Sequence, residues 1–92
     1  MLAPSAPMSG VLGISRIHHT LSTGRIASKT AAGEHALMAF DSRWHRIVKE
    51  CLRIRRGGRG SLYRGPFRRR REALDFIGMA IRRIRADYRA SE

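Results

Sequence analysis

Apolar side chains recur at the period of an α-helix in the stretch from residue 40 to residue 54. They fall at i, i+3, i+4, i+7 and i+8, which places them on one stripe while charged residues occupy the other faces. The members of the stripe are Trp44, Ile47, Val48, Cys51 and Leu52. Asp41 or Ser42 can cap the start of this helix, and the glycines from Gly57 onward end it. The pattern predicts an amphipathic helix over residues 40–54.

A second helical pattern begins at Pro66, whose fixed φ suits a first helical turn, and runs to about Arg89. Its apolar face is formed by Leu74, Ile77, Ile81, Ile84 and Tyr88, flanked by Ala73, Phe76 and Ala80. Residues 57–66 are typical of a loop in composition, and no strand pattern occurs. The predicted fold class is therefore all-α, with two amphipathic helices joined by a basic, glycine-rich loop. We expect an open, partner-dependent arrangement rather than a compact globule.

The first third of the chain differs in composition. Residues 1–33 are rich in Ser, Thr, Ala and Gly and contain three cations but no carboxylate, which is typical of an organellar transit segment. Their apolar residues could form one face of a short helix, namely Val11, Leu12, Ile14, Ile17 and Leu21. A disordered basic tail is the alternative. We therefore expect a transit-like or extended segment over residues 1–35 and a helical RNA-binding domain over residues 36–92.

Charge changes the picture most. The chain has 19 Lys plus Arg against 7 Asp plus Glu, a net charge of +12, and no carboxylate among the residues between Cys51 and Arg71. Such a density favours a polyanionic partner, and arginine binds phosphate in a bidentate manner and stacks on bases. Tyr63 and Phe67 lie within the arginine cluster and could stack on unpaired bases. The candidate RNA-binding residues are Arg46, Lys49, Arg53, Arg55, Arg56, Arg59, Tyr63, Arg64, Arg68, Arg69, Arg70 and Arg71.

Other function classes find little support in the sequence. No apolar run approaches the 20 or so residues of a membrane span, and Cys51 has no second cysteine to pair with. The four histidines and Cys51 lack the paired short spacings of a metal site. No Ser/His/Asp set, carboxylate pair or phosphate-binding P-loop occurs. We therefore expect a protein that is not an enzyme and uses no metal, cofactor or small-molecule substrate.

Several landmarks occur in an order that resembles the S-twenty-one family of small-subunit ribosomal proteins. The landmarks are Phe40-Asp41, Arg46 with Lys49, Cys51, Tyr63-x-x-Pro66 and the run from Arg68 to Arg71 followed by Glu72. The link after Cys51 is shorter and richer in glycine than that family shows, and Arg64-Gly65 replaces its acid–Lys pair. The resemblance implies a structural role on the small ribosomal subunit, with rRNA and neighbouring small-subunit ribosomal proteins as partners. Together with the transit-like segment it implies the mitochondrial form, located in the matrix, ahead of plastid or bacterial cytoplasm.

A rival interpretation depends on Leu62-Tyr63-Arg64. This tripeptide resembles the signature of the mitochondrial LYR-motif adaptors, which bind an acyl carrier protein. The adaptor hypothesis predicts a continuous helix through the tripeptide, whereas the ribosomal hypothesis predicts a loop there. Two further interpretations stay open: a basic subunit of another large assembly, and a fragment of an antibiotic enzyme with a similar helix pair.

Overall fold

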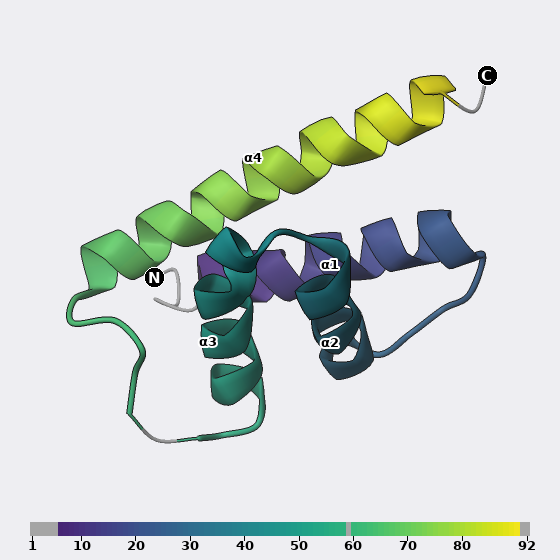
Figure 1. The fold of residues 1–92 in the computed structure, drawn as a ribbon. Coiled ribbons are helices and arrows are strands. Elements are labelled where there is room, and N and C mark those ends of the chain that lie inside the picture. Colours follow the sequence, from purple (N-terminus) through teal and green to yellow (C-terminus); the bar gives the residue numbers. More distant parts are fainter. Residues whose placement is uncertain (1–5, 59, 91–92) are drawn as a thin grey trace.

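The computed structural model describes residues 6–58 and 60–90, which form four α-helices and one short 3-10 turn (Figure 1). The elements in order are α1 (Ala6–Thr23), α2 (Lys29–Ala39), η1 (Ser42–Trp44), α3 (His45–Arg55) and α4 (Pro66–Ala90). Neither described range contains a strand. The all-α fold class is therefore confirmed.

The two helices predicted from periodicity are α3 and α4. Helix α4 begins at Pro66, as predicted, whereas α3 is preceded by the turn η1. Asp41 occupies the N-cap position of η1, but its side chain makes no capping hydrogen bond. Gly57 takes a φ of 74° just after α3, a left-handed conformation that favours glycine and turns the chain out of the helix.

Helix α2 has no counterpart among the predicted elements. The Ser28 side chain caps it by accepting a hydrogen bond from the backbone N–H of Ala31. Its small residues allow neighbouring helices to come close: a Cβ atom on Gly33 would lie 2.7 Å from the Leu52 side chain and 2.8 Å from that of Leu12. Because Ala and Gly carry little apolar surface, the helix gives a weak periodic signal in the sequence.

Helix α4 extends over the other helices, and α1 runs beside it in the same direction (Figure 1). Helices α2 and α3 pack on the other side of α1 (Figure 1). Glycine again permits a close approach, because a Cβ atom on Gly10 of α1 would lie 3.0 Å from the Ile77 side chain of α4. No helix within residues 6–58 and 60–90 combines the length and the apolar character needed to cross a membrane.

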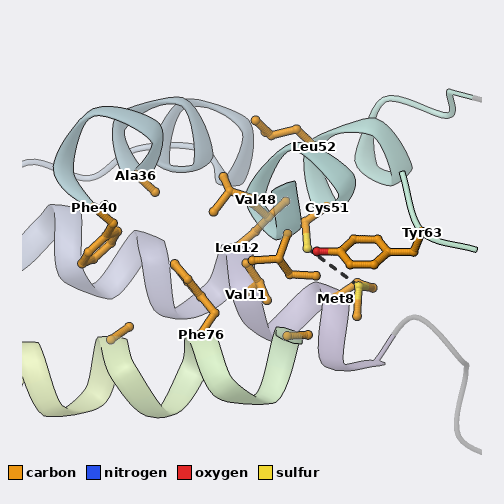
Figure 2. Packing of buried hydrophobic residues seen from close by; sticks show 13 residues of the cluster. Met8, Val11, Leu12, Ala36, Phe40, Val48, Cys51, Leu52, Tyr63 and Phe76 are labelled. Atoms are coloured by element: carbon orange, nitrogen blue, oxygen red, sulfur yellow. Dashed lines mark hydrogen bonds between the residues drawn. The ribbon is translucent and has the colours of Figure 1, made fainter. Parts of the chain in front are cut away.

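The core draws side chains from all four helices and from the loop before α4 (Figure 2). Phe76 is fully buried, and its ring centroid lies 5.5 Å from that of Phe40 and 5.8 Å from that of Trp44, both edge to face. Tyr63 points in from the loop toward Cys51 and Met8 (Figure 2). Cys51 is buried as a small apolar residue, and its thiol contacts the Met8 sulfur at 3.9 Å.

The predicted open pair of helices with an extended N-terminal segment is wrong. Met8, Val11 and Leu12 of α1 lie in the same core as Phe76, so the core spans the predicted boundary between residues 35 and 36. The radius of gyration is 13.0 Å, close to the roughly 12 Å expected of a compact chain of this length.

The face of α1 that packs inward also differs from the predicted one. Val11 and Leu12 are buried as predicted, but Ile17 and Leu21 are exposed. Ser15 occupies the buried face, and its hydroxyl donates a hydrogen bond to the backbone oxygen of Val11 at 2.8 Å. A serine whose hydroxyl is satisfied within its own helix can be buried, and for this reason hydropathy alone misplaced this face.

Candidate functional site

A buried carboxylate lies at the centre of the basic region. Glu50 of α3 is fully buried, and its two oxygens accept four sets of donors. Arg53 donates from both Nε and Nη2 at 3.0 Å, and Arg69 of α4 donates from Nη1 at 3.2 Å. The loop before α4 adds the Ser61 hydroxyl at 2.6 Å and the backbone N–H of Leu62 at 3.2 Å. Glu50 therefore joins α3, the loop and the first turn of α4.

The hydrogen bonds keep Glu50 ionised in spite of its burial. Burial alone would raise its pKa, but the donors from Arg53, Ser61, Leu62 and Arg69 outweigh that effect and lower the pKa from 4.5 to about 2. Its charge in turn raises the pKa of Arg53 through their hydrogen bond. We call Glu50 and these four partners the Glu50 network. At neutral pH it contains a carboxylate held between two guanidinium groups.

A second carboxylate, Glu72, fixes the other end of the loop. The buried Tyr63 donates its hydroxyl to Glu72 Oε1 at 2.7 Å, and Arg68 donates to Oε2 at 3.3 Å. The Arg46 guanidinium lies 5.6 Å from the centre of the Tyr63 ring, within reach of a cation–π interaction. Burial, together with the hydrogen bond to Glu72, raises the pKa of Tyr63. The loop over residues 60–65 is thereby anchored to both α3 and α4.

The structure separates the predicted RNA-binding residues into groups. Arg53 and Arg69 meet at Glu50, while Arg46, Tyr63 and Arg68 lie around Tyr63 and Glu72. Arg56 forms an ion pair with Glu34, and Lys49 lines the same groove, which also includes Arg53. Arg55 lies beside Lys29 instead. Arg59 lies outside the described residues.

Three predicted residues are exposed around the start of α4. Arg64, Arg70 and Arg71 have no carboxylate within ion-pair distance in the described part of the chain. Arg64 lies just before α4, and Arg70 and Arg71 lie in its second turn, near a helix N-terminus whose free backbone N–H groups and dipole also favour an anion. The Glu50 network fixes this end of α4. The arrangement can bind phosphate groups, with cations held in place by neighbouring structure.

Metal binding and thiol chemistry depend on His, Cys, Asp and Glu side chains. No group of three or more of these side chains gathers within residues 6–58 and 60–90 closely enough to hold a metal ion. Cys51 is a poor nucleophile, because burial, reinforced by the charge of Glu50 and opposed by Arg69, raises the pKa of its thiol to about 12.

Sequence reasoning overlooked the role of Glu50, which it placed on the polar side of the helix. One signal was present. The acid-free arginine stretch begins just after Glu50 and ends just before Glu72, and each of these acids binds an arginine from inside the stretch. On a helical wheel Glu50 lies about 60° from Ile47, so it borders the apolar face of α3, where neighbouring parts of the chain can cover a side chain.

A comparison with protein-family models found one match for most of this chain. The model described as the C-terminal domain of aminoglycoside adenylyltransferase matches residues 3–77. No curated protein and no solved structure matches the chain.

This match overturns the ribosomal interpretation, together with its rRNA and ribosomal-protein partners. The landmarks behind the resemblance have structural roles within the chain: Phe40 and Tyr63 are buried, and Arg69 binds Glu50. The LYR-adaptor alternative is also wrong, because Leu62–Arg64 lie in the loop and not in a helix. The localisation expected from the transit-like composition stays a prediction.

Proposed function

The chain belongs to the family of aminoglycoside adenylyltransferase C-terminal domains, and on that basis we propose that it is a helical accessory domain that binds the phosphate groups of a nucleotide. An adenylyltransferase takes its adenylyl group from a nucleotide, whose phosphates are negatively charged. The exposed arginines at the start of α4 suit that charge. The single observation that supports the proposal most is the Glu50 network, which fixes the helix that carries them.

The charge of the chain favours the nucleotide over the aminoglycoside as its own ligand. Aminoglycosides are polycations at neutral pH, and the chain carries a net charge of +12, so the two repel each other at long range. Adenylyl transfer itself needs further groups to activate the acceptor. We propose that the chain is not an enzyme by itself and that these groups come from a catalytic domain.

Calorimetric titration with AMP, ADP, ATP and inorganic tripolyphosphate tests this function. We expect affinity to rise with the number of phosphates and tripolyphosphate to bind nearly as well as ATP, because phosphates supply most of the contacts. The triple variant Arg64→Gln/Arg70→Gln/Arg71→Gln should weaken ATP binding about tenfold or more, since each exposed ionic contact contributes about 0.5 kcal/mol.

A matched variant distinguishes binding at this site from a general effect of positive charge. Arg82→Gln/Arg85→Gln/Arg89→Gln removes the same number of charges from the other half of α4, where the side chains are also exposed. We expect it to change ATP affinity by less than about threefold. Equal losses in the two triple variants, no measurable ATP binding, or tighter binding of an aminoglycoside than of ATP would each refute the proposed function.

A further inference from the structure

Exposed apolar side chains follow α4 at intervals of seven residues. They are Phe67, Leu74, Ile81 and Tyr88, with exposed fractions of 87%, 51%, 38% and 65%. An interval of seven residues shifts the position by only about 20° around a helix, so the four lie on one side of α4. We call this set the apolar stripe. It extends for about 32 Å at the rise of an α-helix.

Phe67, Leu74 and Ile81 of the apolar stripe are separate from the core, whereas Tyr88 at its end also lines a cavity between α4 and α1. Helix α4 packs on α1 and α3 through a different face, which includes the fully buried Ala73, Phe76 and Ala80. Figure 1 shows that one long side of α4 faces away from the other helices. A line of large apolar residues on such a surface is typical of a site that another helix covers.

Arginines flank the apolar stripe along its whole length. They are Arg70, Arg71, Arg82, Arg85 and Arg89, all exposed. None of the five has a carboxylate within ion-pair distance in the residues that the structure describes. Asp75, next to Leu74, and Asp87, next to Tyr88, are also exposed on α4, but the five arginines outnumber them, so the flanks are basic in total.

We propose that the apolar stripe is a docking surface for an acidic amphipathic helix of a partner protein. The seven-residue interval is the one by which two helices pack along a shared seam, and carboxylates beside that seam would pair with the flanking arginines. A second copy of this chain in parallel would bring like charges together, which opposes association. The narrow stripe also suits a helix better than a lipid surface, for which a helix presents a broad apolar face. This surface goes beyond the proposed nucleotide site.

A designed peptide serves as the probe. It has 28 residues in four heptads, with Leu and Ile at the seam positions and Glu beside them, and its own charges keep it monomeric. Fluorescence anisotropy of the labelled peptide measures its affinity for the full chain. We expect binding that weakens as salt is raised. A peptide with Lys in place of Glu should bind at least about tenfold more weakly.

A matched pair of double variants assigns the binding to the stripe. Leu74→Ser/Ile81→Ser removes two apolar contacts without changing charge and should weaken peptide binding about tenfold. Met38→Ser/Ile26→Ser removes two exposed apolar residues away from α4, 83% and 85% exposed, and should leave affinity within about twofold. Circular dichroism melting checks that both variants stay folded.

Four results would overturn the proposal. The first three are no binding of the acidic peptide, binding of the Lys peptide with the same affinity as the acidic one, and the same peptide affinity for the two double variants. The fourth is evidence that the stripe binds another partner instead of an acidic helix. The last takes two forms. One is a dimer of the chain, detected by sedimentation, that Leu74→Ser/Ile81→Ser dissociates. The other is binding of the chain to phosphatidylglycerol vesicles that the same double variant loses. Leu74 and Ile81 are not among the arginines substituted in the nucleotide test, so each proposal can fail without the other.

Discussion

The two halves of α4 are held to the rest of the molecule in different ways. In the first half, Arg69 reaches the fully buried Glu50, and Arg68 shares Glu72 with Tyr63. In the second half, the only acid within reach of Arg83 in the described part is Asp87, at 3.6 Å, and both side chains are more than half exposed. There α4 and α1 flank a cavity of about 350 Å³ lined by His18, Leu21, Ser22, Ile84, Asp87 and Tyr88.

The difference shows how a strongly basic helix can be fixed in place. A buried charge stabilises the fold only when donors satisfy all of it, as they do at Glu50, whereas an exposed ion pair contributes little. His18 of α1 is buried beside the second half of α4, but its Nδ1 atom has no hydrogen-bond partner among the described residues. The first half of α4 is therefore specified by buried polar contacts as well as by the packing of Phe76, whereas the polar contacts of the second half are exposed or long.

Removing the central carboxylate should have the largest effect. Glu50→Ala leaves Arg53 and Arg69 mostly buried without a counter-charge, and the free energy of unfolding should fall by about 3–5 kcal/mol. Urea denaturation measures it. Glu50→Gln, which keeps an acceptor for the Leu62 N–H, should lose less. Asp87→Ala, the matched change in the second half, should lose less than about 0.5 kcal/mol, and equal losses from Glu50→Ala and Asp87→Ala would contradict this contrast.

Acid should weaken the contacts that hold the first half of α4 as pH falls from 4.5 toward about 2. Because the pKa of Glu50 is lower in the folded protein, its contribution is complete above the unfolded value of 4.5 and is lost as pH falls toward about 2. The loss amounts to roughly 3 kcal/mol. Urea denaturation at several pH values should show this slope for the wild type and a much smaller one for Glu50→Gln. Identical slopes for the two proteins would rule out a charged Glu50 network.

A smaller change in the same network should give a smaller loss. Ser61→Ala removes one of the donors to Glu50 and leaves both arginines in place. We expect the free energy of unfolding to fall by about 1 kcal/mol, the usual contribution of one hydrogen bond at a partly exposed position. Thermal denaturation measures it. A loss as large as that of Glu50→Ala would mean that the loop, and not the ion pairs, holds α4.

Milder acid should destabilise the contacts of the second half of α4, and the fall in the free energy of unfolding should be the smallest of these effects. Burial lowers the pKa of His18, Asp87 opposes this, and His35, Arg83 and His19 add to it. A histidine with a lowered pKa stabilises the fold fully above its unfolded value of 6.5, and this contribution is lost as pH falls below that value. His18→Gln should remove the slope just below pH 6.5, while the slope below pH 4.5 stays. Persistence of the upper slope in His18→Gln would show that another group causes it.

The sequence predicted much of the fold where the pattern is apolar. The stripe from Ile47 to Leu52 and the start at Pro66 located α3 and α4, because large apolar residues at a helical period leave few alternatives. Helix α2 gave no such signal, since it packs through Ala and Gly. The arginine cluster was found from composition, but composition suits any polyanion, and the ribosomal partner that the family resemblance implied was wrong. The role of Glu50 depends on Arg69, nineteen residues away, and only the fold brings the two together.

Titration of the Glu50 carboxyl carbon by NMR measures whether a buried, charged carboxylate fixes the first half of α4. The Glu50→Gln variant assigns the signal. The Glu50 network predicts an apparent pKa of about 2 in the folded protein. A value at or above 4.5 would mean that burial prevails over the hydrogen bonds, and it would contradict the account.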